Sequence, residues 1–277
     1  HVFNRSELIE VATFRSGDIN SDDGELVKDQ SGKIIRDNIW GNLDQDTYRR
    51  DFTVNALYYC PKTKKIIGHK DGMSDIHKKS IVSIGDPKKR FSEDPVRSLR
   101  AIRFSNKLKF KIDTKIKDAI YEKGHLLSSI SNARIFDEFC KMFLNGMAEK
   151  NFNKLNSFGL SKFLITTEPD QNEFTSKLIT EALRNTDKRL INNQSVTPGF
   201  LLAALLWPQL IEKCSTKGEI NLRKFFRSMD PILRSQQRIT AIPRKFHSYI
   251  KDIWVLQLKL HSRIGKQPYN CLLYTSP

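Results

Sequence analysis

Cysteine is scarce in this chain of 277 residues, and the few cysteines stand far apart. There are four, Cys60, Cys140, Cys214 and Cys271, and no two of them form a Cys-x-x-Cys pair. Zinc sites and disulfide frameworks both depend on closely or regularly spaced cysteines, so the sequence suggests neither. This usage suits a reducing compartment, and we expect a cytoplasmic protein.

Long apolar runs and two common catalytic signatures are also missing. The longest apolar run covers residues 200–207. A membrane span needs roughly 18 residues, so we predict a buried helix here and no membrane span. The histidines form no His-Glu-x-x-His motif, and Gly32–Lys33 lacks the flanking residues of a phosphate-binding P-loop. These absences argue against a zinc protease and a P-loop nucleotidase.

Acidic residues are fewer than basic ones. The chain has 47 Lys and Arg against 31 Asp and Glu, which gives a net charge of +16 and a pI near 9.7. Such a surplus favours a polyanionic partner, which can be nucleic acid, nucleotide phosphates or an acidic membrane surface. The hydrophobic share of 39%, which includes 17 Phe, indicates a folded protein.

Strand-like and helix-like patterns occupy different parts of the chain. Strand-like segments lie at residues 8–15, 52–59 and 65–70, around a polar loop at 16–35 and a short helical segment at 43–50. From Asp94 onward the spacing is helical, most clearly at residues 113–123, 133–146, 174–185 and 198–214. Gly146 and Gly159 are predicted to end helices. We therefore predict an α+β fold, with a β-sheet head followed by an all-α extension.

Three arginines stand three residues apart in the segment EDPVRSLRAIRFS, which begins at Glu93. They are Arg97, Arg100 and Arg103. Pro95 suits the first turn of a helix, and acidic Glu93 and Asp94 suit its positive end. The apolar residues of the segment are predicted to face the core: Val96, Leu99 and Ile102. The arginine face is either a solvated face held by Glu93–Arg97 pairing, worth about 0.2–0.5 kcal/mol, or a ligand site.

A second dense group of charges begins at Arg49, in the segment RRDFTVNALYY. Arg49, Arg50 and Asp51 lie where the predicted helix passes into the predicted strand over residues 52–59. They either form a simple ion pair at a helix end or clamp phosphate oxygens, because guanidinium forks match such oxygens. Glu10 lies inside the strand predicted over residues 8–15. It either faces water on an edge strand or serves phosphoryl chemistry as a metal ligand or general base.

Several motifs follow one another in a recognisable order. They are IEVATFR, RDNIWGNLDQDTYRRDFTVNALYY, DGMSDI, SIGDPKKRFSEDPVRSLRAIRFS and ARIFDEFCKMF. This combination resembles the class II tRNA nucleotidyltransferase and poly(A) polymerase family. The insertion before RDNIWG and the segments TPGFLLAALLWP and DIWVLQLKLHSRIGKQP resemble its bacterial poly(A) polymerase branch. The resemblance covers residues 7–268.

The resemblance implies template-independent addition of nucleotides to RNA 3′ ends, with ATP as substrate and Mg²⁺ (or Mn²⁺) as cofactor. Asp51 would belong to the active site, and Glu10 would be a third carboxylate on the sheet. The positions that match the family's nucleotide-binding residues are Arg50, Asn55, Asp94, Arg97, Arg100 and Arg103. Asp94 and Arg97 would present hydrogen-bonding edges to the base in place of a template. The RNA-binding residues are not identified.

One departure from the family concerns the metal site. The family's Gly-Gly loop and Asp-x-Asp pair would lie upstream of the strand that begins near Leu8, and neither occurs before that strand in this sequence. Glu10 alone cannot replace two carboxylates, because the metals share oxygen ligands. We therefore expect a fragment that holds no metal and is inactive by itself. The alternatives are a CCA-adding tRNA nucleotidyltransferase and a non-catalytic RNA-binding relative.

The predicted domains follow the changes in pattern and the resemblance. Residues 1–84 would form a partial nucleotidyltransferase head, and residues 85–146 a helical neck that selects the nucleotide. Residues 147–268 would form a helical RNA-binding body. Residues 269–277 differ in composition from the basic segment before them and stay unassigned.

Overall fold

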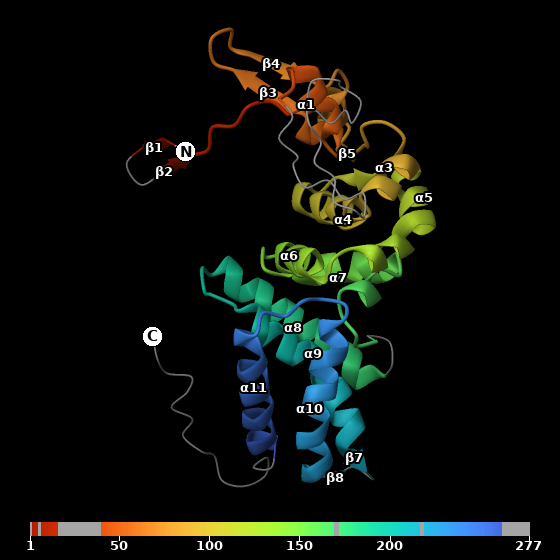
Figure 1. Cartoon of the computed structure of the whole chain (residues 1–277), viewed down its shortest axis with the longest axis vertical. Helices are drawn as coiled ribbons and strands as arrows, with labels where there is room; N and C mark the ends of the chain where they lie inside the picture. The colour runs from red at the N-terminus through yellow and green to blue at the C-terminus, as the bar shows by residue number, and fades with distance from the viewer. Residues whose placement is uncertain (1, 5–6, 16–39, 169–171, 217–218, 262–277) are drawn as a thin grey trace, which may run out of the picture. The chain divides into compact units, whose positions relative to one another are not determined.

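The computed structural model describes residues 2–4, 7–15, 40–168, 172–216 and 219–261. The chain divides into two compact units, His1–Leu126 and Leu127–Pro277, which are described separately below (Figure 1). The polar loop predicted at residues 16–35, the tail at 269–277 and Cys271 lie outside the described residues.

Within the described part of the first unit, the strands form three separate pairs. Two pairs are antiparallel, β1 (Val2–Asn4) with β2 (Glu7–Ile9) and β3 (Leu57–Cys60) with β4 (Lys65–Gly68). The third pair is parallel, β5 (Ser80–Ile81) with β6 (Lys111–Ile112). The strand predicted over residues 65–70 is confirmed at 65–68, whereas the one predicted over 8–15 ends at Ile9.

The strand predicted over residues 52–59 is wrong in its first half. Residues Thr53–Asn55 form a 3₁₀ turn, η1, and the strand begins only at Leu57. Phe52 is fully buried and makes a bridge with Ser83, and the Thr53 hydroxyl donates to buried Asp75 at 2.7 Å. These contacts with residues distant in sequence override the alternating pattern and turn the chain before β3.

The described helices of the first unit are α1 (Leu43–Arg49), α2 (Gly72–His77), α3 (Pro87–Glu93), α4 (Val96–Leu108) and α5 (Thr114–Lys123). Among them, α1, α3 and α5 begin at a residue whose side chain caps them. A 3₁₀ segment, η2 (Gly124–Ser129), follows α5. Asn42 and Gln45 form a capping box at the start of α1, and Asp86 caps α3 in front of Pro87.

The arginine-rich segment is divided between two helices. Glu93 ends α3, and the extended backbone of Asp94 separates it from α4, so both acids precede the first turn of α4. Pro95 cannot donate a backbone hydrogen bond, which favours a new helix start at this point. The predicted core positions of α4 are confirmed, with exposures of at most 1% for Val96, Leu99 and Ile102.

The second unit is almost entirely helical. Its main helices are α6 (Asn132–Phe143), α7 (Ala148–Ser157), α8 (Glu173–Ile191), α9 (Pro198–Cys214), α10 (Leu222–Gln237) and α11 (Lys245–His261). The shorter elements are η3 (Ser161–Phe163), β7 (Ser215–Thr216) and β8 (Glu219–Ile220). Gly146 and Gly159 follow α6 and α7 with φ of 79° and 67°, which confirms the predicted helix ends.

Helix α9 is the centre of this unit, with α8, α10 and α11 packed against it. Its Leu201, Leu205 and Leu210 are fully buried. Trp254 of α11 is also fully buried, and its indole N–H donates to the carbonyl of Ala203 at 2.9 Å. The apolar run at residues 200–207 is therefore a buried helix, as predicted. Across the described residues, no helix is both long and apolar enough to cross a membrane.

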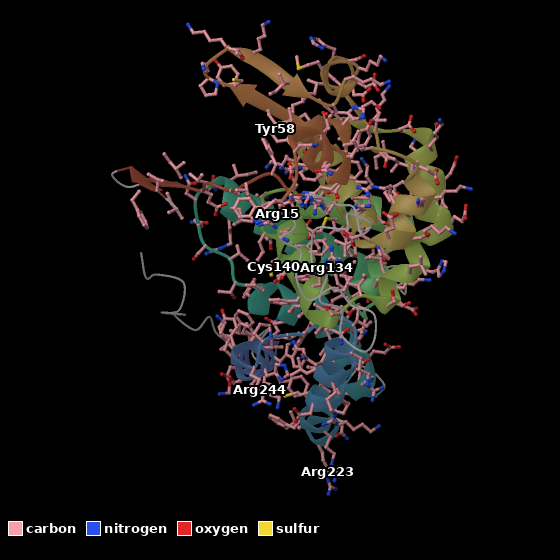
Figure 2. The ribbon with its side chains drawn as sticks, turned by 45° about the horizontal axis from the view of Figure 1, so that its top comes forward. Arg15, Tyr58, Arg134, Cys140, Arg223 and Arg244 are labelled. Carbon is pink, nitrogen blue, oxygen red and sulfur yellow. The ribbon has the colours of Figure 1, made fainter. Side chains whose placement is uncertain are left out.

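The three described cysteines, Cys60, Cys140 and Cys214, are free thiols. Cys140, labelled in Figure 2, lies half-buried in α6. Burial raises the pKa of its thiol to about 11, and nearby Asp137 adds to the rise. At neutral pH this thiol is therefore protonated and a weak nucleophile.

A buried amide fastens the segment after η3 to α10. The Gln236 side chain is fully buried, and its oxygen accepts from the Thr166 backbone N–H at 2.9 Å and from the Thr166 hydroxyl at 3.1 Å. Its nitrogen donates to the Leu164 carbonyl at 2.8 Å, and the Thr240 hydroxyl donates to the same carbonyl at 2.9 Å. One side chain thus satisfies backbone groups that water cannot reach.

Gln236→Leu should lower the free energy of unfolding by roughly 2–3 kcal/mol, because it leaves a backbone donor unsatisfied in the core. Denaturant melts followed by circular dichroism give this value. The matched control is Gln257→Leu, at an exposed position of α11. Equal stability of Gln236→Leu and the parent chain would contradict the role of this amide.

Candidate functional site

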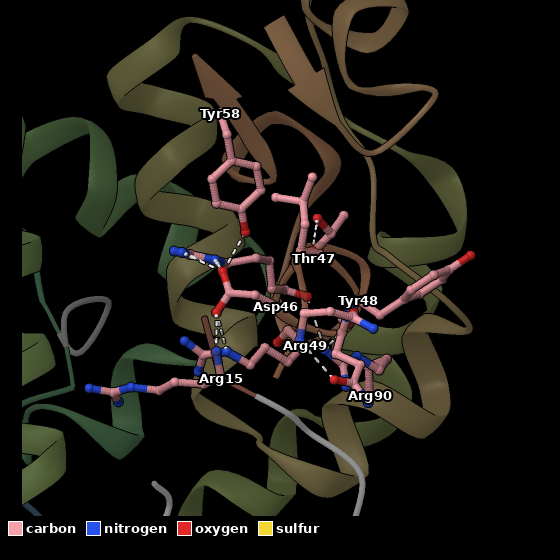
Figure 3. A network of polar contacts seen from close by, with 11 residues as sticks. Arg15, Asp46, Thr47, Tyr48, Arg49, Tyr58 and Arg90 are labelled. Atoms are coloured by element: carbon pink, nitrogen blue, oxygen red, sulfur yellow. Dashed lines mark hydrogen bonds and ion pairs between the residues drawn. The ribbon is translucent and has the colours of Figure 1, made fainter. Parts of the chain in front are cut away.

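The last turn of α1 is organised around a buried carboxylate, Asp46, which is only 2% exposed (Figure 3). Its Oδ1 accepts from Arg49 Nε at 2.8 Å, and its Oδ2 accepts from Arg50 Nη2 at 2.9 Å. The Tyr58 hydroxyl of β3 donates to the same Oδ2, and the Arg15 backbone N–H donates to Oδ1 at 3.3 Å. Asp46 thus orients two arginines at the point where the helix ends.

These contacts shift the protonation equilibria of the group. Burial by itself would raise the pKa of Asp46, but the hydrogen bonds from its four partners outweigh burial and hold this pKa well below its ordinary value of 3.8. Burial raises the pKa of Tyr58, and donation to Asp46 raises it further. Burial would lower the pKa of Arg50, yet the bond to Asp46 leaves that pKa raised. Asp46 is therefore ionised at neutral pH.

Arg90 of α3 holds the end of α1 from another side. Its Nη2 donates to the carbonyls of Tyr48, Arg49 and Arg50 at 3.2, 2.9 and 2.9 Å. These are carbonyls that a helix end leaves without an intrahelical partner, and a cation is favoured there. Burial lowers the pKa of Arg90, and the nearby Arg97 cation lowers it further.

Asp51 follows directly and joins this turn to α4. It is 7% exposed, and its Oδ1 accepts from Arg97 Nε at 3.1 Å. Its Oδ2 lies 2.5 Å from Arg100 Nη2. Arg97 Nη1 also donates to the Arg90 carbonyl at 3.0 Å. One buried carboxylate therefore fixes two of the three arginines in the segment that begins at Glu93.

A polar pocket of about 370 Å³ opens at this junction. Its lining residues are Arg49, Arg50, Asp51, Asn55, Arg100 and Phe104. The Arg100 guanidinium carbon lies 6.0 Å from the centre of the Phe104 ring, and that of Arg103 lies 4.5 Å from it. Three arginines against one aspartate give the pocket a positive charge, which suits an anionic ligand.

The structure brings some of the predicted site residues together and leaves others apart. Arg50, Asp51, Asn55 and Arg100 line the pocket. Arg97 is 9% exposed and contacts Asp51, while Arg103 lies over Phe104. Asp94 lies at the junction of α3 and α4, where its Oδ1 accepts from the Val96 N–H at 3.3 Å. Glu10 is exposed, follows β2 and is not among the lining residues.

Three supporting residues were not identified from the sequence, namely Asp46, Tyr58 and Arg90. The spacing of Asp46 three and four residues before Arg49 and Arg50 is a readable helical ion-pair signal. Nothing local marks Arg90, whose contacts with α1 span more than 40 residues.

The residues present do not fit the divalent metal expected from the resemblance. Within the described ranges, no group of three or more His, Cys, Asp or Glu side chains could hold a metal ion. Both oxygens of Asp51 face guanidinium groups, and Glu10 does not line the pocket. Divalent cations need several oxygen ligands at once. We therefore derive no step through a metal from these residues.

Three family models match the chain. The Poly A polymerase head domain matches residues 1–82, and a probable RNA and SrmB-binding site of polymerase A matches residues 109–174. The polymerase A arginine-rich C-terminus matches residues 217–275. The chain belongs to the poly(A) polymerase and tRNA nucleotidyltransferase family. The family predicted from the motifs is thereby confirmed.

Curated members of this family align along nearly the whole chain. Poly(A) polymerase I of Haemophilus influenzae is 35% identical over 97% of this chain and 62% of its own length. That of Salmonella typhi is 34% identical over 98% of this chain and 61% of its own length. A CCA-adding enzyme of Pediococcus pentosaceus is 37% identical over 57% of this chain and 39% of its own length. The chain thus spans about three-fifths of the length of these poly(A) polymerases.

Solved structures in the family share the fold. A tRNA-processing enzyme in an apo form has a TM-score of 0.61 and 18% identity, over 83% of this chain and 58% of its own. The Thermotoga maritima CCA-adding enzyme complexed with tRNA has a TM-score of 0.55 and 20% identity, over 81% of this chain and 51% of its own. A mixed fold with a helical body is therefore confirmed.

The stability that Asp46 contributes should be lost in acid. Its folded-state pKa lies below the ordinary 3.8, so the contribution is complete above that value and disappears as the pH falls below it. At pH 6, Asp46→Asn should cost about 3 kcal/mol, because it leaves buried cations without their anion. Thermal melts from pH 3 to 7 should show this difference shrinking toward acid pH.

The control for this series is Asp44→Asn, which changes an exposed carboxylate on the same helix. Hydrogen exchange of the α1 and β3 amides should locate the effect of Asp46→Asn there. If the melting temperatures of Asp46→Asn and the parent chain changed with pH in parallel, the ionisation of Asp46 would not contribute to stability.

Proposed function

We propose that this chain serves template-independent polyadenylation, in which AMP from ATP is transferred to the 3′ hydroxyl of RNA. The observation that carries the proposal is the pocket at the end of α1, where three arginines surround one carboxylate. Family membership and alignment with poly(A) polymerases along nearly the whole chain support it. Primer extension with labelled ATP tests it: a longer protein that contains this chain together with the family's Gly-Gly loop and Asp-x-Asp pair should make long A tracts on general RNA, whereas the chain alone should give no extension.

The pocket can bind a triphosphate through its guanidinium groups. Arg49 and Arg50 come from α1 and Arg100 comes from α4, so they approach a ligand from two elements. Guanidinium forks donate paired hydrogen bonds to phosphate oxygens, and each charge-assisted bond is stronger than a neutral one. Asn55 adds an amide for a ribose or base, and Phe104 adds an apolar wall. We assign nucleotide binding to this pocket.

Arg97 contacts Asp51 and Arg103 contacts Phe104, two of the lining residues, and Asp94 lies between α3 and α4. We propose that Asp94 and Arg97 select the base, and that residues 85–146 form the helical neck carrying this selection. Asp51 then fixes Arg97 and Arg100 in register with the pocket. Members of the family use a nucleotide and, in general, a divalent metal. The proposed cofactor is Mg²⁺ or Mn²⁺, whose ligands the described residues do not assemble.

The second candidate function is CCA addition to tRNA. It is favoured by the CCA-adding relative at 37% identity over 57% of this chain. The two functions differ in product, since CCA addition stops after three nucleotides and requires tRNA. Three-nucleotide extension confined to tRNA would replace the proposed function by this one.

Arg100→Gln should weaken ATP binding about tenfold, because it removes a charged donor worth about 1.5–3 kcal/mol from the pocket. Titration of the chain with a fluorescent ATP analogue measures this change. The matched control is Lys89→Gln, which removes one charge at an exposed position of α3. Equal affinities of the two variants would show that overall charge, rather than the pocket, binds the nucleotide.

Asp94→Asn tests base selection. The amide keeps an oxygen that can accept from the Val96 N–H, but it changes the donor and acceptor pattern offered to a base. The ratio of ATP to CTP affinity should fall by about tenfold, since a lost base-edge pair is worth about 1–3 kcal/mol in groove readout. Competition titrations among the four triphosphates measure this ratio. An unchanged ratio would exclude Asp94 from base selection.

A further inference from the structure

One face of α10 carries a row of arginines. They are Arg223, Arg227, Arg234 and Arg238, and all four are exposed. At 3.6 residues per turn, these positions fall within an arc of about 60° and extend along about 22 Å of helix axis. Figure 2 shows Arg223 projecting away from the ribbon at one end of the second unit. We call these four residues the arginine row.

The opposite face of α10 explains why the row points outward. Its buried residues are Phe225, Met229, Ile232, Leu233 and Gln236. Packing against α9 and the amide contacts of Gln236 fix the rotation of the helix. The arginine row therefore has a single orientation and cannot turn into the core.

The row keeps most of its positive charge, because Asp230, which attracts Arg234 electrostatically, is itself ion-paired with Lys251. None of the four guanidinium groups forms a hydrogen bond or an ion pair within the described part of the chain. Asp230 interrupts the row, but it is bound to Lys251 Nζ of α11 at 2.6 Å. This ion pair lowers the pKa of Asp230 and offsets its charge, so the face as a whole is strongly positive.

An exposed aromatic ring borders the row. Phe226 is 53% exposed, and its ring meets the fully buried Phe225 edge-on at 5.5 Å between centroids. Phe225 is in turn held edge-on by Trp207 of α9 at 6.1 Å. A single-stranded base can stack on one face of such an anchored ring, while the neighbouring cations neutralise the phosphates.

We propose that this face of α10 binds the sugar-phosphate backbone of single-stranded RNA and stacks a base on Phe226. The proposal rests on the proposed function and adds to it a site for the RNA, distinct from the nucleotide pocket. Regular cations along a fixed helix fit a flexible polyanion, whereas the pocket at α1 encloses a small one. Contacts from the row to phosphates carry no sequence information, so binding is independent of sequence except for stacking.

The test uses a fluorescein-labelled 15-nucleotide oligo(A) and the whole chain at 50–300 mM salt. Arg227→Gln/Arg234→Gln should reduce the slope of log Kobs against log[salt] by about 1.4, because each single-strand phosphate contact contributes about 0.7. Lys188→Gln/Lys213→Gln removes the same charge at exposed positions of α8 and α9 and should change the slope much less. Arg227→Lys/Arg234→Lys should keep the parent slope.

A second variant tests stacking without changing charge. Phe226→Ala should weaken oligo(A) binding five- to tenfold at constant slope, while Phe174→Ala, at another exposed phenylalanine, should leave binding unchanged. Circular dichroism verifies that each variant is folded. Equal slopes for Arg227→Gln/Arg234→Gln and Lys188→Gln/Lys213→Gln would overturn the proposal. It would also be overturned if Arg227→Gln/Arg234→Gln lost binding to anionic lipid vesicles but still bound RNA as the parent chain does. Absence of RNA binding by the parent chain would instead refute the proposed function.

Discussion

The carboxylate of Asp51 holds together the two segments that create the pocket. It comes directly after α1 and its cap, and it binds Arg97 and Arg100 of α4, which are nearly 50 residues away. Removal of one member of a buried ion pair costs about 3–5 kcal/mol, because its partner is left charged and desolvated. Here a single anion serves two cations, so loss of Asp51 would leave both guanidinium groups repelling each other. The carboxylate of Asp51 therefore helps to hold these arginines of α4 in position beside the end of α1.

Asp46 holds two arginines at the end of α1, as Asp51 holds two arginines of α4. The two carboxylates, with Arg90 acting on the carbonyls between them, fix a region in which cations outnumber anions. Such a region is costly for the free protein, since like charges are held close together and partly desolvated. An anionic ligand relieves that cost when it binds, and the backbone need not rearrange to receive it. The excess of arginines therefore favours the binding of phosphate groups, and the two buried carboxylates hold these arginines in place.

Sequence patterns predicted the helical part better than the turn that forms the site. The period of apolar residues located α6 and α9 to within three residues and α8 except for its last six residues, because each of these helices buries one face in a local, repeating manner. The 3₁₀ turn at Thr53–Asn55 was missed because it depends on Asp75 and Ser83, which lie 20 to 30 residues away. The arginines themselves were identified from their spacing. Their partners were not, since no local pattern relates Asp51 to Arg97.

Arginine side chains lie in different environments in the two units. In the first unit, arginines such as Arg97 are buried and committed to carboxylates, so their geometry is fixed and screening by salt is weak. In the second, the arginines of α10 are exposed, and their guanidinium groups form no hydrogen bond or ion pair among the described residues. Their interactions are long-ranged, easily screened and tolerant of position. Enclosed arginines can therefore discriminate among small ligands, while the exposed row can hold a polymer that must move between additions.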